Sequence, residues 1–231
     1  MPAKGNPFQY QTKVAARGAP GAAGILSVEA AAYLKQIYAL VGSSMLLAVA
    51  SGYTGMHSAW AMEHPILMMV LFIGSALLAM FVRNTATLFL FAGVSGFSIG
   101  PVIAHYVSHG MAGAVGQALF STGAAFGGLT LYSLTTRRDL SRMGGILFAG
   151  LIVLIVGGLV NMFVQSSAMV FALSAGGAVI FSGLILWETQ QYKENPWALP
   201  PAAAALSLYL NVFNLFLNLL QLFGLFGGKD E

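Results

Sequence analysis

The sequence predicts an all-α membrane protein, built as a bundle of transmembrane helices. Of its 231 residues, 58% are hydrophobic and only 7% are charged, whereas about 25% of the residues in an ordinary soluble domain are charged. Several apolar runs of about 20 residues follow one another, and this length crosses the hydrocarbon core of a bilayer. The chain contains no cysteine, so it forms neither a disulfide nor a cysteine-based metal site.

Seven transmembrane helices are expected from the apolar runs, and they make a single domain over residues 28–231. Short polar breaks separate several of the runs, and such tight connections place consecutive helices antiparallel. The expected spans are residues 34–51, 65–82, 86–107, 112–134, 144–164, 168–187 and 202–226.

Residues 1–27 differ from the rest of the chain. They are basic and rich in Gly, Pro and Ala, and they lack an apolar core like that of a signal peptide. We expect them to form a disordered tail that stays attached to the first helix.

The basic residues predict how the bundle is oriented, because cytoplasmic loops carry an excess of Lys and Arg. If consecutive helices alternate in direction, nine of the ten basic residues fall on one side of the membrane and only Lys229 on the other. The nine are Lys4, Lys13, Arg17, Lys35, Arg83, Arg137, Arg138, Arg142 and Lys193. This asymmetry predicts a cytoplasmic N-terminus and an outer, periplasmic C-terminus, and it explains the net charge of +3 without nucleic-acid binding.

Glu188 is the first charged residue after an uncharged run that begins at Met143. In one interpretation it marks the place where the sixth span meets water, since carboxylates are common near helix ends. In the other it is a functional carboxylate with polar partners inside the bundle. The orientation places Arg83 on the same side, so a salt bridge between the two is one expected contact.

The seventh span carries a polar stripe that can supply such partners. Its members recur at intervals of three and four residues: Ser207, Asn211, Asn214, Asn218 and Gln221. At 100° per residue they occupy an arc of about 80° on one helix face. The stripe either forms hydrogen bonds to neighbouring helices or lines a water-filled path that leads from Glu188. Both interpretations turn it toward the interior, because lipid cannot satisfy amides.

The third span contains a G-x-S-G pattern at Gly93, Ser95 and Gly96, as intramembrane serine proteases do. Such a serine needs a histidine base on a later helix, and no histidine follows His109. We therefore expect no enzyme activity. Gly96 and Gly100 instead indicate a close contact between helices.

Four histidines lie near the outer side of the expected bundle. His105 and His109 are one helical turn apart, a spacing that can hold a metal, but the sequence specifies no third ligand. His57 and His64 lie in the outer loop. We therefore expect the four histidines to be polar residues at the membrane rim and not metal ligands. We also expect no cofactor.

Five blocks of the sequence together resemble the Bax inhibitor-1 family. They are "GFSIGPVIAHY", "LYSLTTRRDLSRMGGILFAGLI", "LVNMFVQSS", "IFSGLILWETQQ" and "ALSLYLNVFNLFLNLLQLFG". The resemblance runs from Tyr33 to Gly224, nearly all of the expected membrane region. It implies a seven-helix fold in which the seventh helix is enclosed by the other six.

The resemblance also implies a site near the cytoplasmic face, where acids on helices six and seven share a proton and an arginine on helix two pairs with them. The matching positions here are Glu188, Asn211 and Arg83. Asparagine does not titrate, so the carboxylate pair that would raise a pKa is missing. We therefore expect Glu188 to pair with Arg83 or the Asn211 amide in a structural latch, and ion switching to be weaker than in two-acid relatives.

The single acid at Glu188 is similar to the bacterial YccA-like branch of the family, as are "GPVIAHYVSHGM" and "TTRRDLSRMGG". Members of that branch bind and restrain FtsH, a membrane-anchored ATP-dependent protease. The resemblance implies an inner-membrane regulator of FtsH, with residues 1–27 as the segment that the protease grips. The alternative is a pH-sensitive proton or calcium leak, with Glu188 at its cytoplasmic gate and the polar stripe along its path.

Overall fold

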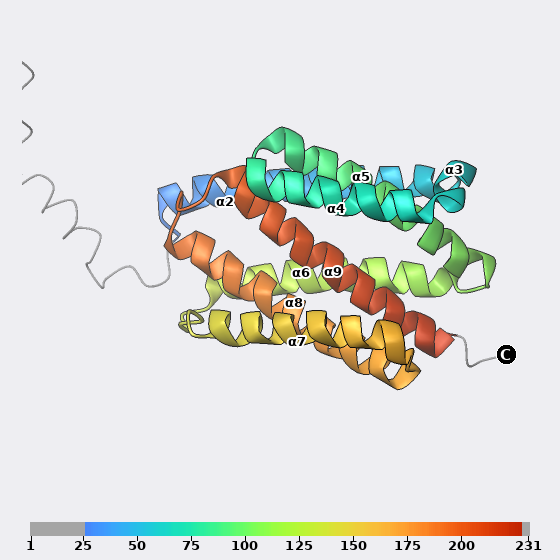
Figure 1. Cartoon of the computed structure of the whole chain (residues 1–231). Coiled ribbons are helices and arrows are strands. Elements are labelled where there is room, and N and C mark those ends of the chain that lie inside the picture. The colour runs from blue at the N-terminus through green and yellow to red at the C-terminus, as the bar shows by residue number, and fades with distance from the viewer. Residues whose placement is uncertain (1–25, 228–231) are drawn as a thin grey trace, which may run out of the picture.

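The computed structural model describes residues 26–227, and within that range it is built from helices without strands. Figure 1 shows their arrangement. The helices are α2 (Val28–Met56), α3 (Ala59–Glu63), α4 (Pro65–Val82), α5 (Thr85–Ser108), α6 (Ala112–Thr135), α7 (Met143–Val164), α8 (Ser167–Glu194) and α9 (Pro201–Gly227). The predicted all-helical class is confirmed. Most of the predicted tail, and Lys229, lie outside the described residues.

Six of these helices are long and apolar enough to cross a membrane: α2, α4, α5, α7, α8 and α9. The predicted seven spans also included α6, which has 24 residues and no charged side chain. Its glycines and hydroxyl-bearing residues make α6 less apolar than the other six helices. The chain is a multi-pass membrane protein, and length and composition support six spans.

Two helices extend beyond their predicted spans. α2 begins at Val28 because the Ser27 side chain caps it, accepting a hydrogen bond from Ala30 N at 3.1 Å. α8 continues past Trp187 to Glu194, although its sequence turns polar there. Glu188, Thr189 and Gln190 at this turn are buried and hydrogen-bonded to α9, α2 and the α6–α7 loop, so they prolong the helix instead of ending it.

A short helix, α3, lies in the outer loop, where the sequence predicted none. The Ser58 side chain caps it by accepting from Ala61 N at 3.2 Å. The turn before Pro65 then starts α4, with the proline in the first helical turn, where its missing N–H costs nothing.

α9 runs obliquely between two groups of helices (Figure 1). One group contains α2, α4 and α5, and the other contains α6, α7 and α8. α9 contacts members of both groups, namely α2, α4, α5, α6 and α8. Half of the apolar window of α9 is buried inside the protein, the largest share among the six candidate spans. α7, by contrast, packs mainly against α8.

α2 and α5 approach each other backbone to backbone. Gly52 and Gly55 of α2 face Gly96 and Gly100 of α5. A Cβ on Gly96 would overlap Ala48 O, and a Cβ on Gly100 would overlap the backbone of Gly55. The predicted close contact at Gly96 and Gly100 is confirmed, because only glycine lets two helices meet this closely.

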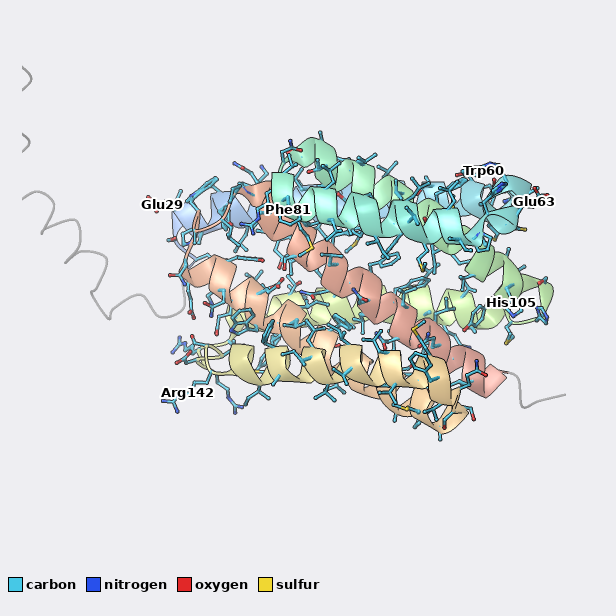
Figure 2. The ribbon with its side chains drawn as sticks, in the orientation of Figure 1. Glu29, Trp60, Glu63, Phe81, His105 and Arg142 are labelled. Atoms are coloured by element: carbon cyan, nitrogen blue, oxygen red, sulfur yellow. The ribbon has the colours of Figure 1, made fainter. Side chains whose placement is uncertain are left out.

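The helices alternate in direction between two ends of the molecule. Figure 2 places Glu29 and Arg142 at one end, and Trp60, Glu63 and His105 at the other. The start of α2 and the α6–α7 loop therefore share an end. This arrangement agrees with the antiparallel order that the short connections predict.

Gln190 of α8 clamps the loop between α6 and α7. Its side chain is buried, with Nε2 donating to Arg138 O and Oε1 accepting from Leu140 N, both at 2.7 Å. The Gln190 side-chain amide thus satisfies one backbone N–H and one backbone carbonyl of the loop. Backbone groups of this kind are costly to leave unpaired when they are buried.

Other polar groups of this loop are paired as well. Lys193 Nζ reaches three carbonyl oxygens at the C-terminal end of α6, including Leu134 O at 3.0 Å. Asp139 accepts from Ser141 N at 2.9 Å. Hydrogen bonds from the Ser141 side chain and backbone hold the pKa of the exposed Asp139 carboxyl below its ordinary value.

Replacing Gln190 tests the clamp. Gln190→Leu keeps the side-chain size but removes both hydrogen bonds, and each buried group left unpaired costs about 1–3 kcal/mol. We expect the Leu140 amide to exchange hydrogen at least about tenfold faster, while the α9 amides remain protected. Gln191→Leu is the control, because Gln191 Nε2 is buried and has no partner within residues 26–227. Equal acceleration in both variants would contradict the clamp.

Candidate functional site

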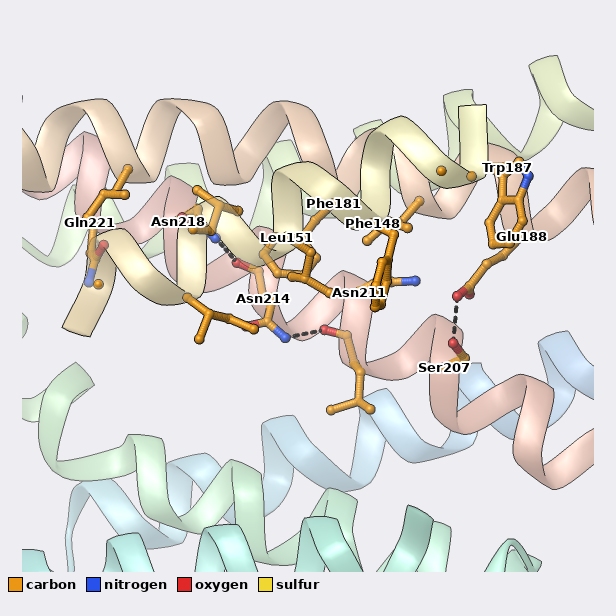
Figure 3. Close-up of a pocket in the computed structure, with 18 of the residues that line it drawn as sticks. Phe148, Leu151, Phe181, Trp187, Glu188, Ser207, Asn211, Asn214, Asn218 and Gln221 are labelled. Atoms are coloured by element: carbon orange, nitrogen blue, oxygen red, sulfur yellow. Dashed lines mark hydrogen bonds between the residues drawn. The ribbon is translucent and has the colours of Figure 1, made fainter. Parts of the chain in front are cut away.

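A cavity of about 1050 Å³ lies between α7, α8 and α9. Its α9 wall is polar and contains the whole predicted stripe: Ser207, Asn211, Asn214, Asn218 and Gln221. Its α7 wall is largely apolar and includes Phe148, Leu151, Leu154 and Ile155. Glu188 lines the same cavity from α8, as Figure 3 shows. The stripe and Glu188 therefore meet in one space.

The Glu188 carboxylate is enclosed by protein, and only 8% of the residue is exposed. Oε1 accepts a hydrogen bond from Ser207 Oγ at 2.6 Å (Figure 3). Oε2 accepts from Tyr192 OH at 3.5 Å, which is the outer limit of a hydrogen bond. Because a buried carboxylate is costly unless it is hydrogen-bonded, Ser207 is its principal partner.

Arg83 is not brought to this site. Its backbone ends α4 in the left-handed conformation, with φ of 51°. The side chain is exposed, and Nε donates to Met80 O at 2.9 Å. The salt bridge expected between Arg83 and Glu188 is therefore absent, and no other basic residue within 26–227 pairs with Glu188. α8 has α6, α7, α9 and α2 as its main neighbours, so α4 cannot present a side chain to it.

Asn211 lies in the cavity one turn after Ser207, and it is 6% exposed. Its Nδ2 has no hydrogen-bond partner among the described residues. Figure 3 shows this nitrogen pointing toward the end of the cavity that holds Glu188 and Trp187. The amide is thus beside the carboxylate, close to it but without a hydrogen bond of ordinary geometry.

The other stripe residues divide into two kinds. Asn214 Nδ2 donates to Leu210 O at 2.8 Å, and Asn218 Nδ2 donates to Asn214 O at 2.7 Å, so both amides bond to their own helix. At the far end, Ser174 Oγ of α8 donates to Gln221 Oε1 at 2.6 Å. The stripe is therefore joined to α8 by hydrogen bonds at its two ends.

Asn218 packs directly on Gly177 of α8. A Cβ at Gly177 would overlap the Asn218 amide. The glycine thus makes room for the amide between the two helices.

Adding one methyl group tests this fit. Gly177→Ala should displace the Asn218 amide and lower the free energy of unfolding in detergent by about 1–3 kcal/mol, as overpacking does. The double variant with Asn218→Ala should recover most of the loss. Gly176→Ala is the control, because its Cβ would meet Leu154 at an ordinary 3.7 Å. A loss of the same size at Gly176 would show that helix α8 tolerates no alanine there.

Two site residues escaped the sequence interpretation. Trp187 lies against Gly144 of α7, where a Cβ would come within 2.6 Å of the indole. Trp187 also lines the cavity, and its Nε1 is buried without a partner among the described residues. Tyr192 follows Glu188 by one helical turn, and this spacing is the signal that could have identified it.

The serine of the G-x-S-G pattern is buried and bonded. Ser95 Oγ and Tyr209 OH are 2.7 Å apart, which ties α5 to α9. At the outer end, His109 Nδ1 lies 2.8 Å from His105 O. Within the described part of the chain, no three His, Asp or Glu side chains gather as a metal site would require.

Comparison with known proteins gives a family match over most of the chain. The family described as inhibitor of apoptosis-promoting Bax1 matches residues 30–228. An uncharacterized protein of Helicobacter pylori (strain ATCC 700392 / 26695) is 31% identical over 208 residues, covering 87% of this chain and 90% of its own.

Two Escherichia coli relatives carry more informative names. "Modulator of FtsH protease YccA" of strain K12 and "Inner membrane protein YccA" of strain O6:H1 are each 37% identical over 142 residues. The match covers 62% of this chain and 64% of each relative, so it spans just under two thirds of their length. The family match, in contrast, reaches from the first turn of α2 to the end of α9. The chain belongs to the Bax inhibitor-1 family of membrane proteins.

Proposed function

We propose that this protein is an inner-membrane regulator that binds and modulates the membrane-bound ATP-dependent protease FtsH. The observation that carries the proposal is the Escherichia coli relative named as a modulator of that protease. The site agrees with a regulatory role rather than a catalytic one, because Ser95, the one serine in a nucleophile-like pattern, bonds to Tyr209.

The proposed topology has seven membrane helices, with α6 crossing the bilayer beside the six more apolar helices and α9 enclosed by the others. The N-terminus lies in the cytoplasm, and the C-terminus in the periplasm. The shared end of Glu29 and Arg142 supports this orientation, because it gathers the arginines of the α6–α7 loop at the end where the chain enters α2. Residues 1–27 are then available to a protease whose ATP-dependent part faces the cytoplasm.

Co-purification tests the regulatory function. The full-length chain, solubilised in mild detergent, should recover FtsH, and removal of residues 1–27 should reduce the recovery at least about tenfold. Glu188→Gln is the matched control and should recover the protease normally. Failure of the full-length chain to recover FtsH would overturn the proposal. Equal recovery without the tail would instead place the contact on the helices.

A second function is favoured by the cavity itself. Its polar wall extends along α9 from Ser207, which bonds to Glu188, to Gln221, and this suits a path for protons. One carboxylate is a poor calcium site, because calcium prefers six to eight oxygen ligands. Proton flux into proteoliposomes should then fall sharply in Glu188→Gln and increase in Asn211→Asp, which restores a second carboxylate. Flux that is absent, or unchanged in Glu188→Gln, would exclude the path.

A further inference from the structure

The cavity between α7, α8 and α9 has the length of one leaflet of a bilayer. Hydrogen bonds mark its two ends, Ser207 to Glu188 and Ser174 to Gln221. Residues 207 and 221 are 14 positions apart, which is about 21 Å of helix. Half of a bilayer, with its headgroup region, measures about 20–22 Å. A lipid molecule therefore matches the cavity from end to end.

The cavity is wide enough for a hydrocarbon chain. A volume of about 1050 Å³ spread over about 21 Å gives a mean cross-section of about 50 Å².

One end of the cavity places a buried amide donor beside a weakly used acceptor. Asn211 Nδ2 is buried and makes no hydrogen bond of ordinary geometry with the described residues, although its side chain lies close to the Glu188 carboxylate. Glu188 Oε2 accepts the long 3.5 Å contact from Tyr192 OH. A buried donor without a partner is costly, and a ligand oxygen would remove that cost. A phosphate or carboxylate would place a like charge next to Glu188, so a neutral hydroxyl or amide fits best.

The rest of the cavity suits an apolar chain. Phe148, Leu151 and Ile155 of α7 form the wall opposite the stripe. The side-chain N–H groups of Asn214 and Asn218 donate to carbonyl oxygens of their own helix. These two donors therefore need no acceptor from an acyl chain that passes them. We propose that the cavity binds a neutral lipid of the monoacylglycerol class, with its hydroxyl head at Glu188 and Asn211 and its acyl chain along α7. This goes beyond protease regulation and does not depend on it.

Lipid binding is measured on the full-length protein in phospholipid nanodiscs, with 1-monooleoylglycerol as the probe and native mass spectrometry to count retained lipid. Oleic acid and oleylamine at the same mole fraction are the comparison arms. Monooleoylglycerol should bind at one molecule per chain, at least about tenfold more tightly than oleic acid. Tighter binding of oleylamine would make the site a cation site and overturn the proposal. Equal binding of all three, or none, would overturn it too.

Two variants locate the site. Asn211→Leu removes the amide donor at similar volume and should weaken binding about tenfold. Gly158→Leu fills the chain region, and it is expected to fold because nothing lies within 4 Å of its Cβ. Gly128→Leu on α6 has the same open surroundings but lies outside the cavity, so it is the control. Binding should be lost only in Gly158→Leu, and binding retained in that variant would overturn the proposal.

Discussion

Gly96→Ala and Gly100→Ala are expected to destabilise the protein by about 3 kcal/mol or more each, the upper end of what overpacking by one methyl group costs. A Cβ at position 96 would overlap Ala48 O, and a Cβ at position 100 would overlap the backbone of Gly55. Backbone atoms cannot turn away as a side chain does, so α2 and α5 must separate. This separation weakens the van der Waals contacts along the whole α2–α5 interface, and such contacts hold membrane helices together.

Gly93→Ala is the matched control, because it lies on α5 one turn before Gly96. Its Cβ would meet only Leu47 Cδ2, at an ordinary 3.9 Å. Alanine is the better helix former by about 1 kcal/mol, so this variant should be neutral or slightly stabilised. The free energy of unfolding is measured in mixed detergent micelles titrated with a denaturing detergent. Equal losses at positions 93 and 96 would mean that α2 and α5 do not meet as closely as described.

Ser207→Ala is expected to cost about 2 kcal/mol, since it removes the short hydrogen bond that stabilises the buried Glu188 carboxylate. Tyr192→Phe should cost much less, because its contact with Glu188 is 3.5 Å long. Glu188→Gln should also be mild, since the amide oxygen still accepts from Ser207. The expected order of the losses in stability therefore identifies the Ser207 hydroxyl as the main partner of Glu188.

A double-mutant cycle between Ser207→Ala and Glu188→Leu, which removes the acceptor at similar size, measures the pair directly. The coupling should be at least about 1 kcal/mol, and it should vanish in a cycle between Ser207→Ala and Arg83→Gln, because the Arg83 side chain donates to Met80 O and not to Glu188. A larger loss in Tyr192→Phe than in Ser207→Ala would contradict the geometry of the site.

The sequence was informative wherever composition changes abruptly along the chain. The span predicted at 65–82 coincides with α4, because Pro65 starts the helix and the polar Arg83 and Asn84 follow its end. The end of α8 could not be predicted in the same way. Glu188 and Gln190 look like the polar end of a span, but both are buried, and their partners come from α9 and from the α6–α7 loop.

The partner of Glu188 could not be predicted, because topology gives the side of the membrane on which a residue lies but not which helices are neighbours. Arg83 and Glu188 were assigned to the same side, yet α4 packs mainly on α5, with smaller contacts to α3 and α9. Periodicity did identify the stripe on α9, since a shared helix face depends only on spacing. It could not show that Trp187 would rest on Gly144, because that contact depends on how α7 and α8 are rotated.

The two hydrogen bonds between α8 and α9 fix the register of these helices. Ser207 meets Glu188, and Gln221 meets Ser174, so the partners are equally far apart on the two antiparallel helices. Two hydrogen bonds at matching distances define a single register of α9 along α8.

A shift of α9 along α8 by one helical turn would break both hydrogen bonds. In one direction Glu188 would face Ala203, and in the other Ser174 would face Leu225. Each shift leaves a polar side chain opposite an apolar residue, so the two hydrogen bonds oppose a translation of α9 along α8. Among the described residues, no such side-chain hydrogen bond joins α7 to α8, and the α7 helix ends at Gln165. We therefore expect any widening of the cavity to come from an outward movement of α7 about the connection at Gln165.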